Sequence, residues 1–248
     1  MQDTTINTKY FNKIDTNIKA YLLGFIAADG SIVKNNVKNG STTLTITIHH
    51  KDIAILELPK SELNSELSIK NINIKSKSLS SYKLDVNHVR FNTSKKEIIN
   101  DLIKHGIDYN KSLTMKNIII KIPKRFRKSF IIGYFDGDGC FVDSLVNKNK
   151  HRYNKQGEYL RTDTYLGYNS SISIKGSKEF LQGIVKELKI KSFTLKQLSQ
   201  QKIYTLVLTS NDSILKFYTC YSDCEFYLNR KKEKFTRKIL QVQTISSS

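Results

Sequence analysis

Two aspartates stand at matching places in this sequence, and each is followed by glycine and preceded by small and apolar residues. Asp29 lies in the segment YLLGFIAADGSI, and Asp138 lies in the segment IIGYFDGDGCFV. Carboxylates that recur in this way are candidate ligands for divalent metal ions. The two segments align at a constant spacing of 109 residues, which pairs Gly24 with Gly133, Ala28 with Gly137 and Gly30 with Gly139. Such an internal repeat indicates two similar halves.

The run before each aspartate predicts a helix with one face of small residues. Residues four apart lie on the same face of a helix, so Gly24 shares a face with Ala28, and Gly133 shares one with Gly137. Small residues allow two helix backbones to approach closely. We therefore expect these two helices to pack against each other along these faces.

Gly30 and Gly139 are expected to end the helices in a left-handed conformation, which glycine adopts without strain. Asp29 and Asp138 would then lie at helix C-termini, where the helix dipole is already negative, and near each other, where like charges repel. A divalent cation reverses each unfavourable effect. Because carboxylates, carbonyls and phosphate oxygens are the ligands that Mg²⁺ prefers, the pair predicts metal-dependent phosphodiester hydrolysis.

The elements that must position these acids predict an α+β fold of two halves, each in the order helix, two strands, helix, two strands, helix. Gly106 is expected to end the helix that a capping box of Ser94 and Glu97 begins, and Ser177 to cap another. The expected strands are Thr43–His49, Ser68–Lys75, Tyr82–Phe91, Asn169–Lys175, Phe193–Ser199 and Ile203–Thr209. The other expected helices are Lys51–Leu67 (broken or kinked at Pro59), Ser94–His105, Ser177–Leu188, Ser213–Tyr221 and Glu225–Gln241.

The expected domain organisation is a first half at 1–112, a linker at 113–122 and a second half at 123–248. Pro123 is tolerated in the first turn of the second motif helix. The longest insertion, Asp143–Gly167, is basic and polar and separates the first two strands of the second half. It predicts an extended hairpin or loop.

The charge balance indicates a polyanionic partner. The chain of 248 residues carries 41 Lys and Arg against 22 Asp and Glu, a formal net charge of +19. A bias toward AT-rich codons explains lysine over arginine but not the scarcity of acids. Nucleic acid is the expected partner.

Other classes of protein are disfavoured by composition. No apolar run approaches the roughly 20 residues needed to cross a bilayer, and the N-terminus lacks a signal-peptide core. The cysteines are Cys140, Cys220 and Cys224, an odd number with no second pair to complete a metal site. We expect an intracellular location at DNA, either an organelle or the cytoplasm of a bacterium or phage host, and not secretion.

At this point the residues resemble a known family. Leu22–Gly30 (LLGFIAADG) and Ile131–Gly139 (IIGYFDGDG) resemble the LAGLIDADG motif of homing endonucleases. Asn110-Lys111-Ser112 and Tyr227–Phe235 resemble further elements of that family. The resemblance implies a single chain of two pseudo-symmetric αββαββα halves, with the motif helices at the central interface and two antiparallel sheets forming a DNA-binding saddle.

The resemblance also implies roles for the motif residues. Asp29 and Asp138 would bind the metal ions through their carboxylates, and Ala28 and Gly137 through backbone carbonyls. Mg²⁺ is the expected cofactor, Mn²⁺ is expected to substitute, and Ca²⁺ to bind without supporting cleavage. The earlier acid of the motif is present as Asp136 but is Ala27 in the first copy, and we expect a structural role for it.

Three further residues are implied to assist catalysis. Lys111 and Lys231 would stabilise charge near the scissile phosphates, although Arg230 and Lys232 leave the register of Lys231 open. His50, near the end of the first strand, is the candidate to hold the water network. The second half has no good match at the like position, Lys175-Gly176.

Polar residues on one face of the strands are expected to contact DNA. Leu44, Ile46 and Ile48 would face the helices, so that the alternate residues face a major groove wide enough for a β-ribbon. The predicted set is Thr43, Thr45, Thr47, His49, Asn71, Asn73, Lys75, Lys83, Asn87, Ser171, Ser173, Lys175, Thr194 and Lys196, with Arg152 and Arg161 of the insertion on phosphates.

The sequence thus predicts a monomeric, site-specific, double-strand DNA endonuclease. Two dissimilar halves imply an asymmetric target, and the resemblance implies a staggered cut with 3′ overhangs. Two alternatives of the same fold stay open. One is an RNA maturase that assists intron splicing, and the other is a DNA-binding regulator without cleavage activity.

Overall fold

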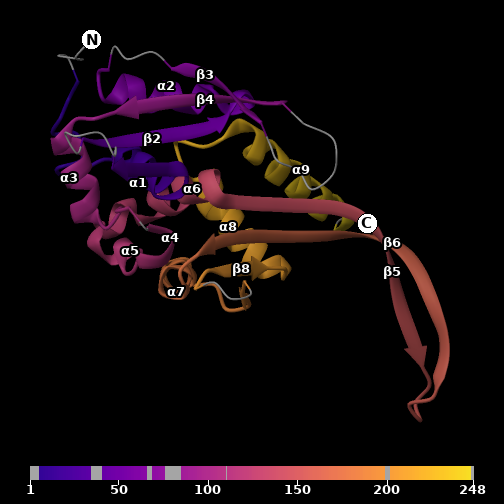
Figure 1. Ribbon diagram of the computed structural model, residues 1–248. Coiled ribbons are helices and arrows are strands. Elements are labelled where there is room, and N and C mark those ends of the chain that lie inside the picture. The colour runs from indigo at the N-terminus through magenta and orange to yellow at the C-terminus, as the bar shows by residue number, and fades with distance from the viewer. Residues whose placement is uncertain are drawn as a thin grey trace.

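The computed structural model describes residues 6–34, 41–65, 69–75, 85–109, 111–198 and 202–246 (Figure 1). The first half contains α1 (Asn17–Asp29), β1 (Gly30–Lys34), β2 (Thr42–His49), the 3-10 turn η1 (His50–Asp52), α2 (Ala54–Glu62), β3 (Lys70–Lys75), β4 (Asp85–Thr93) and α3 (Lys96–His105). The second half contains α6 (Arg127–Asp138), β5 (Gly139–Tyr153), β6 (Tyr159–Gly176), α7 (Lys178–Glu187), β7 (Thr194–Gln197), β8 (Tyr204–Leu208), α8 (Asn211–Ser222) and α9 (Asn229–Ser246).

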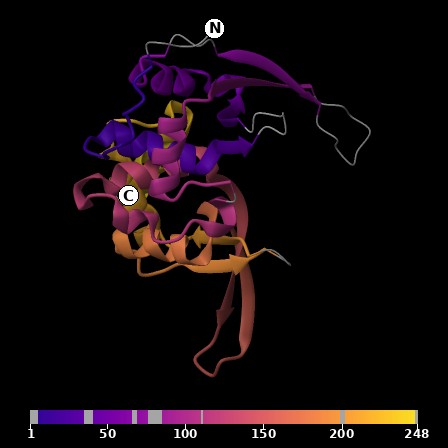
Figure 2. The ribbon, with the colours of Figure 1, turned by 60° about the vertical axis from the view of Figure 1, so that its left-hand side comes forward.

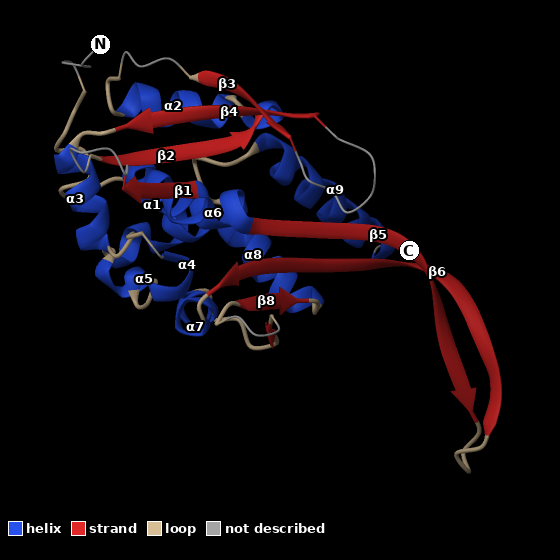
Figure 3. Ribbon diagram, viewed as in Figure 1, coloured by secondary structure: helices blue, strands red, loops and turns tan. Residues whose placement is uncertain are grey.

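The two halves have the same topology, which confirms the predicted α+β class of two αββαββα repeats. Each contains a four-stranded antiparallel sheet, with the orders β1-β2-β4-β3 and β5-β6-β8-β7. Helices α1 and α6 lie between the two sheets (Figures 1 and 3). Alternation explains the layering, because Leu44, Ile46 and Ile48 on β2 are buried while the residues between them are not.

The two motif helices pack in backbone contact, as their small residues predict. A Cβ atom added at Gly24 would lie 2.0 Å from the carbonyl oxygen of Phe130, and one added at Gly133 would lie 2.0 Å from that of Tyr21. Every residue of α1 from Ala20 to Ala28 is buried. A helix that is buried all round carries the interface between the halves.

Three short elements join the halves in and around the segment 113–122, which was predicted as a linker. They are α4 (Lys111–Thr114), α5 (Ile118–Lys121) and the 3-10 turn η2 (Lys124–Phe126). Ile118 and Ile119 are buried in the core, so this segment is packed against the body of the protein. Pro123 precedes η2, and α6 itself begins only at Arg127.

A long two-stranded hairpin extends away from the second sheet, as the basic insertion predicts (Figures 1 and 2). Strands β5 and β6 pair from Gly139–Ile174 out to Tyr153–Tyr159, whereas β6 pairs with β8 only over Ile172–Gly176. Beyond Asp143 the two strands therefore pair only with each other.

Gly30 and Gly139 are not left-handed helix caps, which corrects the sequence-based expectation. Their φ angles are −71° and −85°, in the extended region. Each is instead the first residue of a strand and is required by crowding. A Cβ at Gly30 would lie 2.6 Å from the Ile26 carbonyl oxygen, and one at Gly139 would lie 2.0 Å from the Phe135 ring.

Two other helix expectations also change. Ser94 is not the N-cap of α3, which begins after Lys95 without a side-chain cap, because the Ser94 hydroxyl is hydrogen-bonded to Thr43. Helix α2 continues through Pro59 to Glu62 instead of breaking there. Gly106 does end α3 with a φ of 98°, and the Ser177 hydroxyl accepts a hydrogen bond from the amide of Phe180, as predicted.

Candidate active site

The crossing of α1 and α6 brings Asp29 and Asp138 to the same end of the interface. The Asp29 carboxylate lies against the second helix, since a Cβ added at Gly137 would be 3.3 Å from its Oδ2 atom. Burial, followed by the charge of Asp138, raises the pKa of Asp29 to about 6. Burial also raises the pKa of Asp138, although the charges of Lys111, Lys175 and Lys231 oppose this shift.

The donor set at this point fits a divalent cation. Neither carboxylate forms a side-chain hydrogen bond or an ion pair with another residue in the part of the chain that the structure describes. Asp29 is half-buried and Asp138 is exposed, and a half-buried carboxylate beside a second acid is costly without a counter-charge. Their hard oxygen atoms are the ligands that Mg²⁺ and Ca²⁺ take. Asp29 and Asp138 are therefore the residues that would hold such an ion.

Lys111 caps the C-terminal end of α1 with its ammonium group. Its Nζ atom donates hydrogen bonds to the carbonyl oxygens of Ile26 (3.3 Å) and Ala27 (2.6 Å), and also to that of Ala28. Burial lowers the pKa of Lys111 to about 8, against the charges of Asp138 and Asp29, which raise it. A cation at this position offsets the negative end of the helix dipole beside the two acids.

Lys231 holds the equivalent position at the end of α6. Its Nζ atom donates to the carbonyl oxygens of Phe135 (2.6 Å), Asp136 (2.8 Å) and Gly139 (2.7 Å), and only 5% of Lys231 is exposed. Burial lowers the pKa of Lys231 to about 8 as well. The two adjacent basic residues point to other partners. Arg230 forms an ion pair with Asp52, and the Lys232 ammonium lies over the Tyr227 ring. Lys231 is thus the geometric counterpart of Lys111.

These lysines also contact the backbone beside the expected carbonyl ligands. The Ala28 carbonyl, predicted to face a metal ion, accepts a hydrogen bond from Lys111. Lys231 contacts carbonyls on either side of Gly137 and not that of Gly137. A carbonyl oxygen has two lone pairs, so Ala28 and Gly137 stay predicted ligands beside the two carboxylates.

Asp136, whose matching position in the first copy is Ala27, is buried and fully hydrogen-bonded, as a structural role requires. It is 1% exposed and accepts hydrogen bonds from the Tyr21 hydroxyl, the Tyr221 hydroxyl and the Leu228 amide, each at 2.8 Å. These donors come from α1, from α8 and from the segment that leads into α9 and Lys231. Asp136 therefore ties the first motif helix to the end of the chain that carries a candidate catalytic lysine.

A cavity of about 270 Å³ opens beside Asp29. Its wall includes Thr47 and His49 of β2 and His88 of β4. His49 and His88 are paired across the strands, and their ring centroids are 6.0 Å apart. His50, predicted to hold the water network, is exposed at the start of η1 and is not among the residues that line this cavity.

Strand register identifies the matching positions in the two halves. Gly30 pairs with Ile46 and Gly139 pairs with Ile174, so the next residues, Thr47 and Lys175, are equivalent. Both residues were predicted to lie on the DNA-facing surface, but local patterns do not match them to each other. His88 was not predicted, because only the pairing of β2 with β4 reveals that it lies opposite His49.

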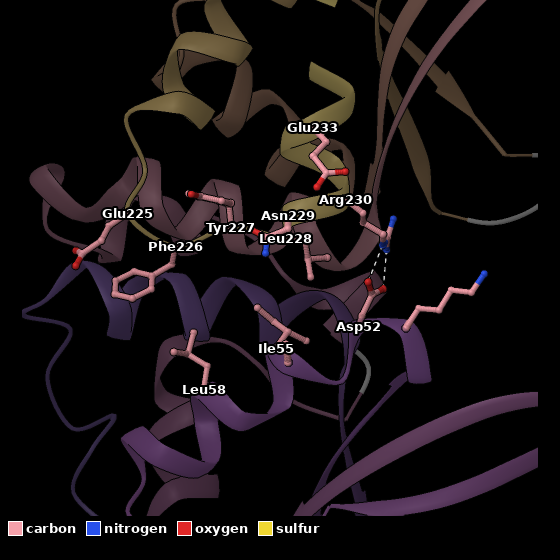
Figure 4. A pocket seen from close by; sticks show the side chains of 12 residues that line it. Asp52, Ile55, Leu58, Glu225, Phe226, Tyr227, Leu228, Asn229, Arg230 and Glu233 are labelled. Carbon is pink, nitrogen blue, oxygen red and sulfur yellow. Dashed lines mark hydrogen bonds and ion pairs between the residues drawn. The ribbon is translucent and has the colours of Figure 1, made fainter. Parts of the chain in front are cut away.

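An ion pair joins the two halves next to this cavity. Arg230 Nε lies 2.7 Å from Asp52 Oδ1, and Arg230 Nη2 donates to Asp52 Oδ2 at 2.8 Å (Figure 4). The pair also borders a second cavity of about 630 Å³ between α2 and the segment around Phe226 (Figure 4). Since Asp52 also raises the pKa of Asp29, this bridge influences the charge at the candidate site.

In the second half, strand register places the predicted DNA-facing residues together. Ser173 pairs with Val207, Lys175 with Thr205, and both partners also pair with β7 residues. Paired residues share a face of a sheet. Ser171, Ser173, Lys175, Thr194 and Lys196 therefore lie on one face, opposite Ile172 and Ile174.

In the first half the predicted DNA-facing residues do not all share one face. Thr43, Thr45, Thr47 and His49 share the polar face of β2, where Arg90 donates a hydrogen bond to Thr47 at 3.0 Å. Asn71 pairs with the buried Val89 and therefore lies on the opposite face of the sheet, as does Asn87 two residues before Val89. Asn73 pairs with Asn87 and Lys75 with Asp85, and Lys83 lies outside the described residues.

The difference on β3 has a physical cause. Its sequence KNINIK suggests that Ile72 and Ile74 face the core, but Ile72 pairs with His88 on the polar face. A shift of one residue moves every side chain of a strand to the other face. On the same face as the β2 residues, the structure places Arg90 and Asn92 instead.

Arg152 and Arg161 lie on the hairpin. They pair directly across β5 and β6, and each Nε atom contacts Asp163, at 2.8 Å and 3.0 Å. Both residues are exposed. Their distance along the hairpin separates them from the two aspartates, so any contact that they make with DNA lies outside the candidate active site.

The fold and the paired acids define a class of protein for which solved structures exist. The LAGLIDADG homing endonuclease I-LtrWI, bound to its target DNA, is similar with a TM-score of 0.59, 17% identity, and coverage of 98% of this chain and 92% of that one. The LAGLIDADG meganuclease I-AabMI, bound to uncleaved DNA, has a TM-score of 0.58 and 15% identity, with coverage of 92% of this chain and 91% of that one. I-SmaMI, bound to an uncleaved DNA target in the presence of calcium ions, has a TM-score of 0.56 and 13% identity, with coverage of 92% of both chains.

These similarities establish that the chain has the fold of LAGLIDADG homing endonucleases over nearly its whole length. No protein-family model matches the sequence, and no curated protein matches it significantly. No helix in the described part of the chain is long and apolar enough to cross a membrane.

Proposed function

We propose that this protein is a LAGLIDADG homing endonuclease that cuts both strands of a specific, asymmetric DNA site with the help of divalent metal ions. The observation that carries the proposal is the pair Asp29 and Asp138. Two carboxylates with raised pKa values meet at the ends of helices in backbone contact, and a lysine lies at each helix end. Nothing in the packing of the helices requires acids there.

Each group at the site would have a different role in hydrolysis. A bound Mg²⁺ would supply Lewis-acid activation of water and neutralisation of phosphate charge. Asp29 and Asp138 would hold and orient that ion. Lys111 and Lys231 carry positive charge within reach of both acids and would stabilise the negative charge that builds up on a phosphate during hydrolysis.

The two sites differ in their remaining residues. Beside Asp29 lie Thr47, His49 and His88, whereas Lys175 occupies the position that matches Thr47 beside Asp138. Polar groups near the carboxylates would hold the waters that surround the ion. This difference, with the unequal hairpins, supports an asymmetric target read by one monomer.

The charge and the sheet faces support double-stranded DNA as the substrate. The net charge is +19, and each sheet has a polar face whose side chains alternate with the buried ones. Two neighbouring structures of this fold, I-LtrWI and I-AabMI, are described with DNA bound. Side chains on such strands suit base edges and phosphates in a major groove. An intracellular location at DNA follows from this proposal.

The proposal is tested by cleavage of a plasmid that carries the sequence flanking the insertion point of the gene. The wild type is expected to linearise the plasmid with Mg²⁺ or Mn²⁺ and to bind without cutting in Ca²⁺. Asp29→Asn and Asp138→Asn should each reduce double-strand cutting at least 100-fold, because each removes the charge of one ligand, while binding in Ca²⁺ persists.

Asp223→Asn, which changes an exposed acid at the end of α8, serves as the matched control and should cut normally. Full activity of either motif variant would refute the assignment of Asp29 and Asp138. Tight binding to an intron transcript without DNA cleavage would favour the maturase alternative. Tight DNA binding without cleavage under any metal would favour the regulator.

A further inference from the structure

The hairpin formed by residues 143–170 has two chemically different faces. Strand register assigns each residue to a face, because directly paired residues lie on the same side of a sheet. One face, which we call the cationic face, contains the even-numbered residues of β5 up to Arg152 and the odd-numbered residues of β6 from Arg161 onward; beyond this pair the register shifts, and Tyr153 pairs with Tyr159. Its outer members are Lys148, Lys150, Arg152, Arg161, Asp163 and Tyr165.

The cationic face continues the polar face of the second sheet. The same alternation leads inward along β6 from Tyr165 to Ser171, Ser173 and Lys175. These are the residues that lie opposite the buried Ile172 and Ile174. The face that we propose to contact DNA therefore continues onto the hairpin, with the pair Val146 and Gly167 between its inner polar residues and its outer cations.

Ion pairs hold the outer part of this face in place. Asp163 contacts both Arg152 and Arg161, and its direct partner across the strands is Lys150. The hydrogen bond from Arg152, with the charges of Arg161 and Arg152 next, lowers the pKa of Asp163. The face therefore carries one carboxylate and four cations, and its net charge is positive. The cations are Lys148, Lys150, Arg152 and Arg161.

The opposite face of the hairpin has no lysine or arginine along its paired strands from Asp143 to Tyr153. It contains the exposed Leu145 and Leu166, and Tyr153 and Tyr159 pack edge to face with ring centroids 6.1 Å apart. Charge complementarity thus favours DNA on the cationic face alone.

The dimensions of the hairpin match a duplex. The 11 residues from Asp143 to Tyr153 span about 35 Å at roughly 3.3 Å per residue, which is about one turn of B-DNA. Lys148, Lys150 and Arg152 recur every second residue, about 6.6 Å apart, which corresponds to two base-pair rises of about 3.4 Å along the axis of the duplex.

We infer that the hairpin is a DNA-binding arm whose cationic face contacts the phosphates of about one helical turn beyond the second-half end of the target. This inference rests on the proposed function and adds an extended footprint on one side. The first half has no counterpart in its described residues, where β1 and β2 are short. The footprint is therefore expected to be longer on the second-half side.

The test uses a face-swapped variant of the full chain. Asn147→Lys, Lys148→Asn, Asn149→Lys and Lys150→Asn together keep the composition and net charge but move two cations to the other face. Binding is measured in Ca²⁺ to the duplex identified by the plasmid assay, and to versions shortened by about ten base pairs at either end. Circular dichroism and the melting temperature verify that the variant is folded.

The wild type should lose affinity when the second-half end is shortened. The variant keeps Arg152 and Arg161 on the cationic face but lacks both lysines there, so it should lose less affinity than the wild type on the same shortening. The loss of two phosphate contacts reduces the slope of log K against log salt by about 1.8, so the wild type should lose about 12-fold more affinity than the variant between 50 and 200 mM salt. A variant that keeps the wild-type salt slope and flank dependence would overturn the inference.

The outcome distinguishes this inference from the proposed function. A wild type that cuts DNA but is indifferent to the shortened flank contradicts only the arm. A wild type that binds no duplex contradicts both.

Discussion

Asp29 keeps its proton to a higher pH than a solvated aspartate because its carboxyl group is buried against a second acid. Its pKa is raised from 3.8 to about 6, so the folded protein binds a proton that the unfolded chain has released between these values. Without a divalent ion, the contribution of Asp29 to the free energy of unfolding is therefore most favourable below pH 4. This stability is lost as the pH rises to about 6. A cation that binds the ionised form restores it.

The first prediction concerns this pH dependence. Without metal, wild type should lose up to about 3 kcal/mol of unfolding free energy relative to Asp29→Asn between pH 4 and pH 6.5, since one pKa unit corresponds to about 1.4 kcal/mol. The affinity for Ca²⁺ should rise over the same range and level off above it. Chemical denaturation and calorimetric titration measure the two quantities.

Asp223→Asn provides the control, because this acid is exposed, lies at the end of α8 and is not among the residues that line the cavity beside Asp29. It should follow the wild type in both measurements. A Ca²⁺ affinity that stays constant from pH 5 to pH 7 would show that Asp29 is not a ligand.

At the scale of elements, the motif helices meet through their backbones and not through interlocking side chains. Gly24 contacts the Phe130 carbonyl, and Gly133 contacts that of Tyr21, so the interface leaves no room for a methyl group at either position. An intrahelical glycine otherwise costs about 1 kcal/mol relative to alanine. The close contact of the helices is the compensating gain.

The second prediction is that Gly24→Ala and Gly133→Ala each destabilise the protein by 3 kcal/mol or more. The added Cβ would lie 2.0 Å from a carbonyl oxygen, so the two helices must separate. Overpacking by a single methylene already costs about 1–3 kcal/mol where only side chains must move. Midpoints of urea denaturation measure the effect.

Gly183→Ala on α7 is the matched substitution. The Cβ there would meet only the flexible end of Ile119 at 3.2 Å, and helix propensity favours alanine. It should change stability by less than about 1 kcal/mol. Equal effects at Gly183 and Gly133 would show that the interface tolerates expansion.

Local patterns in the sequence predicted most elements but not their contacts. The repeat, the helix faces and the hairpin are properties of neighbouring residues, so they could be predicted. The role of Gly30 could not, because the Ile26 carbonyl that excludes a side chain is known only once β1 folds back. The register of β3 failed similarly, since Ile72 faces away from the core only through its pairing with β4.

The candidate site shows the same limit. Asp29 and Asp138 could be found because each stands where local physics opposes an acid. Lys231 was one of three adjacent basic residues, and only the fold shows that its ammonium group reaches the end of α6. His88 and Asp52 gave no signal, because what brings them to the cavity is strand pairing and an ion pair across the halves.

For the molecule as a whole, the two halves form one structural unit. Helix α1 is buried from Ala20 to Ala28, and Asp136 of the second half accepts a hydrogen bond from the Tyr21 hydroxyl of the first. A separated half would expose an apolar helix to water. The buried Asp136 carboxylate also holds Tyr221 and Leu228, so its contacts depend on both halves being folded.

The third prediction is therefore a single cooperative unfolding transition. Calorimetric and van't Hoff enthalpies should agree within error for the wild type. Asp136→Ala should lower the unfolding free energy by about 3–5 kcal/mol, because it leaves buried donors without an acceptor. Asp143→Ala on the hairpin, which removes the single part-buried hydrogen bond that the Ser170 hydroxyl donates to Asp143, is the comparison and should cost only about 1 kcal/mol. Two resolved transitions in the wild type would contradict the single unit.

The backbone contact between α1 and α6 also fixes the distance between the two aspartates. Because the carbonyls of Tyr21 and Phe130 lie against Gly133 and Gly24, the spacing of the two aspartates depends on main-chain atoms that substitution elsewhere does not alter. Under the proposed function, that spacing sets the offset between the two cuts. The strand faces can then diverge toward new target sequences over evolutionary time while the length of the overhang stays the same.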